Sequence, residues 1–74
     1  MTEPVPTSVS VSVNGERRGV PAGTSLDALV ATLTAAHSGV AAAVNEAVVP
    51  RSRWSATVLA DGDRVEVLTA VQGG

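Results

Sequence analysis

The residues of this 74-residue chain that could take part in chemistry are few, and the final pair, Gly73 and Gly74, stands out. Glycine has no Cβ atom, so a glycine pair at the end of an extended tail is thin enough to enter a narrow channel. Fully extended, residues 70–74 span about 16–18 Å. We therefore expect a tail of Val71, Gln72, Gly73 and Gly74 that can place the α-carboxylate of Gly74 in the active site of another protein.

The remaining side chains offer little chemistry of their own. The chain has no cysteine, which excludes a disulfide framework, a thiolate metal site and a thiol nucleophile. Its one histidine, His37, has no evident nucleophile partner, and we expect only a favourable position near a helix C-terminus. Asp61 and Asp63 supply too few oxygen ligands for a calcium site, and we expect them to form a turn. We therefore expect no catalytic residue, no metal site and no bound cofactor.

The charge balance excludes another class of partner. Five arginines face seven acidic residues, which gives a net charge of −2. Binding to nucleic acid requires clustered positive charge, often with aromatic platforms, and the chain has a single aromatic residue, Trp54. No apolar run is long enough to span a membrane, and residues 1–4 lack the pattern of a signal peptide. We expect a cytoplasmic protein that binds neither nucleic acid nor membrane.

The elements that must position the tail begin with a hairpin. Residues 1–7, which include two prolines, are expected to be a flexible leader to a domain over residues 8–69. In Ser8–Val13 valine and serine alternate strictly, which is typical of a half-buried strand. Asn14 and Gly15 favour the two positive φ angles of a tight turn, so a returning strand over residues 16–20 follows.

A helix is expected next. Ser25 and its neighbours resemble a capped helix start, and Leu26, Leu29, Val30 and Leu33 form one apolar stripe at helical spacing. We expect the helix to end near Gly39. The later elements are expected to be strands at Val40–Val44, Ala47–Val49 and Arg64–Thr69, with a short helical turn around residues 52–55. This order predicts an α+β fold, a ubiquitin-like β-grasp whose mixed sheet has one main helix packed on one face.

A partner surface is expected beside the tail. The alternation in Arg64–Thr69 turns Val65 and Val67 inward and leaves Leu68 on the other face, and exposed apolar patches mark interaction sites. One alternative is that a small satellite core under the loop covers Leu68, Val71 and Leu59. For the two arginines, the alternative is ordinary solvation. Trp54 is expected to be packed. The residues proposed for partner docking are Leu68, Leu59, Val71, Arg51 and Arg53.

Three segments carry a resemblance to a known family. The run over residues 43–54, the stretch over residues 61–67 and the terminal glycine pair resemble the ThiS-type sulfur carrier proteins of thiamine biosynthesis, within the ThiS/MoaD superfamily. The resemblance extends from about Val9 to Gly74. The motif from Pro50 to Trp54 and the final four residues favour the thiamine branch, because the small subunits of molybdopterin synthase usually carry an aromatic-proline stretch before the glycines.

The resemblance implies a carrier that is a substrate and not an enzyme. An E1-like adenylyltransferase of the ThiF type would use ATP to adenylate Gly74, and a sulfur donor would then displace AMP and leave a thiocarboxylate. A thiazole synthase of the ThiG type would use that sulfur, and the free carrier is expected to be monomeric. A carrier for molybdopterin or another pathway, a ubiquitin-like modifier and a plain β-grasp interaction module remain open alternatives. The absence of lysine excludes lysine-linked chains of this protein on itself.

Overall fold

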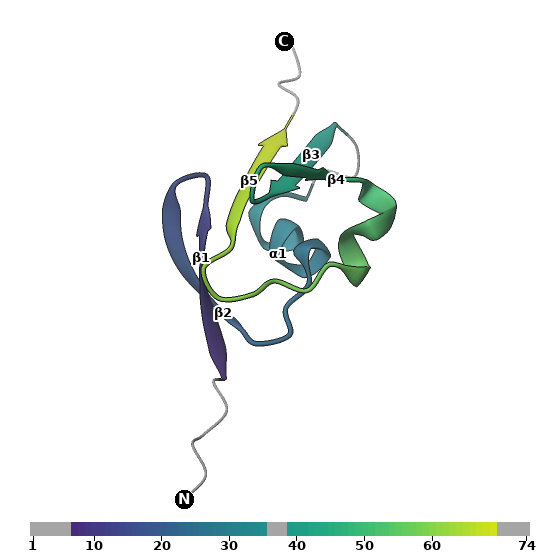
Figure 1. Ribbon diagram of the computed structural model, residues 1–74. Helices are drawn as coiled ribbons and strands as arrows, with labels where there is room; N and C mark the ends of the chain where they lie inside the picture. The colour runs from purple at the N-terminus through teal and green to yellow at the C-terminus, as the bar shows by residue number, and fades with distance from the viewer. Residues whose placement is uncertain (1–6, 36–38, 70–74) are drawn as a thin grey trace, which may run out of the picture.

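The computed structural model describes residues 7–35 and 39–69, and it contains a five-stranded mixed sheet with one α-helix against one face (Figure 1). The strand order is β2-β1-β5-β3-β4; β1 and β5 are parallel, and the other pairs are antiparallel. This is the predicted fold class. The elements are β1 (Ser8–Val13), β2 (Glu16–Pro21), α1 (Leu26–Leu33), β3 (Val40–Val44), β4 (Ala47–Val49), the 3₁₀ helix η1 (Arg51–Ala56) and β5 (Arg64–Thr69).

The two hairpins have turns with left-handed backbone conformations. Asn14 and Gly15 join β1 to β2 with φ angles of 51° and 87°, as the sequence predicts. Asn45 and Glu46 join β3 to β4 with φ angles of 51° and 72°. Positive φ at both central residues matches the twist of the flanking strands, so each turn sets the register of its hairpin.

The core lies between the sheet and α1. Alternation in β1 and β5 buries one side of each strand, and Trp54 of η1 joins the same cluster with 2% of its surface exposed. The prediction that Trp54 packs inside the protein is therefore confirmed. The buried residues are Val11, Val13, Val20, Leu26, Leu29, Val30, Ala42, Trp54, Leu59, Val65 and Val67.

Helix α1 is shorter than predicted. The Ser25 side chain caps its first turn, where Oγ accepts a hydrogen bond from the Ala28 N–H at 3.1 Å. The helix ends at Leu33, because Thr34 adopts an extended conformation that suits a β-branched residue. Gly39 has the positive φ expected of it, at 72°, but at the entry to β3 and not at the helix end. No helix within residues 7–35 and 39–69 is long and apolar enough to cross a membrane.

Candidate functional site

The strand that leads into the C-terminal residues, β5, occupies the centre of the sheet (Figure 1). It pairs with β3 over almost its whole length, from Val65 to Thr69, and with β1 only at its first two residues, Arg64 and Val65. Thr69, the last described residue, is held by its pairing with Val40 of β3. The predicted reactive group on Gly74 and the tail residues Val71, Gln72 and Gly73 lie outside the described residues, as do His37 and most of the leader.

A polar network holds the start of β5. Asn45 Oδ1 accepts a hydrogen bond from the Arg64 N–H at 2.9 Å, and Asn45 Nδ2 donates to Asp63 Oδ1 at 3.0 Å. Asp63 Oδ2 also accepts from the Ala60 N–H, while Asp61 Oδ1 accepts from the Ser10 N–H. The two carboxylates therefore organise the predicted turn. Among the described residues, no group of three His, Cys, Asp or Glu side chains could hold a metal ion.

The carboxamide of Asn14 holds β5 further along. Its Oδ1 accepts from the Val67 N–H at 2.9 Å, and its Nδ2 donates to the Val67 carbonyl at 3.2 Å. The last backbone bond from the end of β1 to β5 is donated by the Asn14 N–H to the Val65 carbonyl. The Asn14 side chain therefore takes the place of a β1 residue opposite Val67, where the β1 backbone has already turned into the hairpin.

The face of the sheet opposite α1 carries an apolar depression beside the end of β5. Leu68 is 71% exposed and Val48 is 77% exposed. In the strand register Ala41 lies opposite Leu68, and Ala43 lies between Glu66 and Val48. The small alanines leave a hollow of about 180 Å³, which we call the open-face hollow; it is lined by Asn14, Ala41, Ala42, Ala43, Val48, Glu66 and Leu68.

The expectation that Leu59 belongs to an exposed partner surface is wrong. Leu59 is only 3% exposed and belongs to the core. Its N–H donates to the Thr24 carbonyl at 2.9 Å, and the neighbouring Val58 forms a bridge with Ser25. This pairing turns Leu59 inward and leaves Val58 outward, with 60% of its surface exposed.

The two arginines proposed for docking lie on η1, which packs against α1, and neither lines the open-face hollow. The Arg51 guanidinium lies over the Trp54 ring, 4.9 Å from its centroid, so this arginine covers the indole from outside. Arg53 is exposed. Of the described docking candidates, Leu68 alone contributes to the hollow.

Sequence reasoning missed Val48, the two alanines and Asn14 as contributors to this surface. Each lies on a different strand or turn from Leu68, and their meeting depends on the register between β3, β4 and β5. The one available signal was the alternation of β3, which places Ala41 and Ala43 on the same face.

Comparisons with known proteins agree on a family. The chain matches the ThiS family over residues 8–74. The sulfur carrier protein ThiS of Escherichia coli K12 is 27% identical over 66 residues, which are 89% of this chain and 100% of that protein. A thiazole synthase of Magnetococcus marinus is 38% identical over 66 residues, but the chain spans only 20% of that protein.

Solved structures support the same assignment. The crystal structure of a thiamine biosynthesis protein (ThiS) from Geobacter metallireducens superposes with a TM-score of 0.72 and 30% identity, covering 89% of this chain and all of that one. An NMR structure of a thiamine biosynthesis protein from the same organism gives a TM-score of 0.73 at 30% identity, covering 89% and 88% of the two chains. The family match runs through both terminal glycines, and the central strand β5 leads into them. The chain therefore belongs to the ThiS family of sulfur carrier proteins in thiamine biosynthesis.

Proposed function

We propose that the α-carboxylate of Gly74 carries the sulfur. A carboxylate is a poor electrophile because it is anionic and stabilised by resonance. Attack of one carboxylate oxygen on the α-phosphorus of ATP forms an acyl adenylate and releases pyrophosphate. A donor that delivers sulfur at the oxidation level of sulfide then attacks the carbonyl carbon; the C–S bond forms as the C–O bond to AMP breaks, which leaves a thiocarboxylate. The carrier supplies the reacting carboxylate, and its partners supply the catalytic groups.

The observation that carries this proposal is the extent of the family match, which runs from residue 8 through Gly74. The placement of β5 supports it. A central strand gives the five following residues a fixed origin, and extended chain of that length reaches about 16–18 Å from Thr69. That reach is sufficient for the terminal carboxylate to enter the active site of a docked partner.

We propose that partners dock on the open-face hollow, with Leu68 as its main apolar contact. Leu68 and Val48 are large exposed hydrophobic residues close to the end of β5, and such groups stabilise interfaces when they are buried. An enzyme bound to this hollow would lie next to the end of β5, from which the C-terminal residues continue. The hollow is rimmed by Asn14 and Glu66, which supply polar contacts for orientation.

Two partners follow from the proposed chemistry. An E1-like, ThiF-type adenylyltransferase supplies the ATP-dependent step in the cytoplasm. A ThiG-type thiazole synthase consumes the thiocarboxylate. The similarity to one fifth of a Magnetococcus marinus thiazole synthase supports the second partner. In that protein, a segment similar to this chain is part of the same polypeptide as the rest of the synthase. Joining two segments in one chain raises their effective concentration for each other.

Intact mass spectrometry tests the proposal. The untagged carrier is incubated with ATP, a ThiF-type enzyme and a sulfur donor, and its mass is compared with that of a sample lacking ATP. We expect a gain equal to the difference between one sulfur and one oxygen atom, localised to Gly74 by fragmentation. A thiazole synthase reaction supplied with this product should return the carrier to its original mass.

Other outcomes would contradict the proposal. Covalent adducts of the carrier with other proteins would indicate a protein modifier. Formation of the thiocarboxylate followed by consumption only in a molybdopterin synthase reaction would place the carrier in that pathway. An unchanged mass with an enzyme that activates a known ThiS protein would indicate an interaction module without carrier chemistry.

A further inference from the structure

Within residues 7–35 and 39–69, no strand pairs with the outer edge of β2, so this edge presents unpaired backbone groups. The Ser12 and Asn14 N–H groups bond to β5, so the even-numbered residues of β1 face β5 and the odd-numbered residues face β2. The register then directs the backbone groups of Glu16, Arg18 and Val20 toward β1. Those of Arg17 and Gly19 therefore point away from the sheet, where β2 is the last strand in the order.

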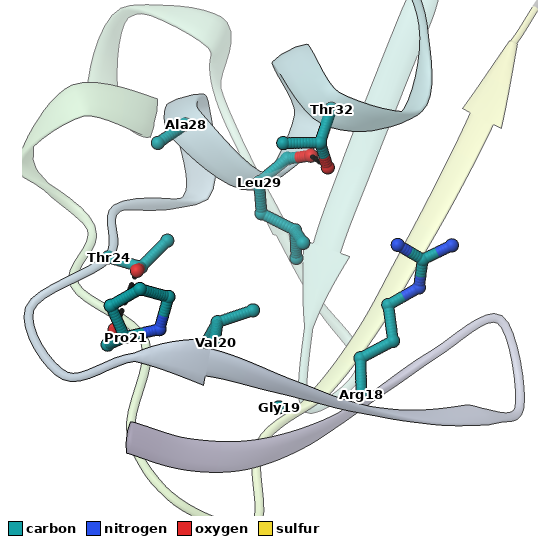
Figure 2. Close-up of a pocket in the computed structure, with 8 residues that line it drawn as sticks. All are labelled: Arg18, Gly19, Val20, Pro21, Thr24, Ala28, Leu29 and Thr32. Atoms are coloured by element: carbon teal, nitrogen blue, oxygen red, sulfur yellow. Dashed lines mark hydrogen bonds between the residues drawn. The ribbon is translucent and has the colours of Figure 1, made fainter. Parts of the chain in front are cut away.

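A groove runs along this edge, between β2 and α1 (Figure 2). Figure 2 shows Leu29 extending from α1 toward Val20 on β2, with Arg18 at one end of the groove and Thr24 at the other. The groove has a volume of about 500 Å³. Its helix wall is low because Ala28 and Thr32 are small. The lining residues are Arg18, Gly19, Val20, Pro21, Thr24, Ala28, Leu29 and Thr32.

The charge of the groove is positive. Among the described residues that line it, Arg18 is the only charged one, although the chain as a whole has a net charge of −2. The Thr24 and Thr32 hydroxyls donate to the carbonyls of Pro21 and Leu29, each at 2.6 Å. Their donors are thus engaged within the chain. The groove therefore complements an apolar side chain together with a carboxylate.

Gly19 has no structural requirement for glycine. A Cβ atom placed there would meet nothing within 4 Å, and its φ is not in the left-handed region. Glycine in a strand costs about 0.5–1 kcal/mol relative to alanine. A glycine inside a strand is typical of a site where another backbone approaches closely. Gly19 lies in the middle of the open edge, between Arg18 and Val20.

We propose that the β2 edge and its groove bind an extended, acidic segment of a partner protein as a sixth, antiparallel strand. The partner residue opposite Gly19 exchanges both backbone hydrogen bonds with it. Its two neighbours then point to the helix side of the sheet, one opposite Val20 and one opposite Arg18. The segment therefore reads, from N- to C-terminus, apolar residue, any residue, then aspartate or glutamate.

This surface is separate from the one in the proposed function. The groove lies on the helix side of the sheet at the β2 edge, whereas the open-face hollow lies on the opposite side over β3, β4 and β5. A partner on β2 leaves Leu68 and the end of β5 uncovered. One protein can therefore bind the β2 edge while the tail enters another. Binding at the β2 edge does not depend on the sulfur chemistry, so the two proposals can fail separately.

The test is titration of the ¹⁵N-labelled carrier with the capped peptide acetyl-Val-Thr-Ile-Thr-Glu-Thr-amide. We expect saturable shifts of the Arg17 and Gly19 amides and of the α1 residues that line the groove. Gly19→Pro removes the outward N–H while keeping the ladder to β1, and it should abolish binding with the remaining spectrum conserved. Arg18→Glu should weaken binding about fivefold. A peptide with lysine in place of glutamate should restore the affinity of that variant.

Arg17→Glu is the matched control. Arg17 belongs to the same strand, but its side chain is on the open face, with Nη1 3.4 Å from Ser10 Oγ, so this variant should bind the peptide nearly as well as the wild type. Absence of saturable shifts, shifts confined to the open face, or undiminished binding by Gly19→Pro would each overturn the proposal. Concentration-dependent shifts of β2 without peptide would show that a second copy of the chain occupies this edge instead, which would also overturn it.

Discussion

At the scale of single residues, Asn14 has two structural roles that belong to different atoms. Its backbone adopts a φ of 51° in the hairpin turn, while its carboxamide forms two hydrogen bonds with Val67. Asn14→Gly suits the positive φ of the turn and removes the carboxamide along with the rest of the side chain. We expect a loss of about 1–3 kcal/mol in the free energy of unfolding, measured by urea denaturation, because two partly buried hydrogen bonds are lost.

Asn45→Gly provides the comparison for that experiment. Asn45 has the same φ and bonds the same strand, but at its start, through Arg64 and Asp63. Because Asn14 rims the open-face hollow and Asn45 does not, Asn14→Gly should raise the KM for the activating enzyme while Asn45→Gly leaves it unchanged. Equal KM values for the two variants would limit Asn14 to a role in stability.

Leu68 gives the second prediction at this scale. Leu68→Asp should raise the KM of the adenylating enzyme about thirtyfold with little change in kcat, because an apolar contact at the centre of an interface contributes about 2 kcal/mol. The control is Val58→Asp, which alters an apolar residue of similar exposure, 60%, outside the hollow. Circular dichroism should show both variants folded. A similar loss of activity in both would contradict docking through the hollow.

At the scale of elements, Trp54 fixes η1 to the rest of the fold. Its indole is buried, and Nε1 donates to the Val49 carbonyl of β4 at 2.8 Å. Trp54→Ala should cost about 3–5 kcal/mol and leave so small a domain largely unfolded at room temperature. Trp54→Phe keeps most of the apolar volume but leaves the Val49 carbonyl without its donor, so a smaller loss of about 1–3 kcal/mol is expected in thermal unfolding.

At the scale of the whole molecule, the domain and its carboxylate are separable. The described core runs from Val11 to Val67, so it does not require the last residue of the chain. Deletion of Gly74 should leave the melting temperature unchanged and abolish formation of the thiocarboxylate in the mass assay. A product formed on the shortened chain, with the same gain in mass at Gly73, would contradict the assignment of Gly74 as the attachment residue.

Much of the architecture could be predicted because local patterns carry it. Alternation in Ser8–Val13 and Arg64–Thr69 identifies strands and their buried faces, and Asn14-Gly15 specifies a tight hairpin whatever surrounds it. The predicted helix end, near Gly39, lies beyond the observed end at Leu33. Glycine is a strong signal for a helix end, whereas a threonine such as Thr34 is a weaker one. The inward turn of Leu59 had no periodic signal, since it depends on pairing of a loop with the start of α1.

The amino-acid sequence by itself therefore determined the secondary-structure elements, the mixed sheet with one helix, and the family that the terminal glycines indicate. Only the tertiary structure decided which residues share a surface. Leu68 meets Ala41 and lies near Val48 through long-range register, and Gly19 faces outward because β2 is an edge strand. Strand order and register arise from contacts between distant parts of the chain, and local spacing along the sequence does not encode them uniquely.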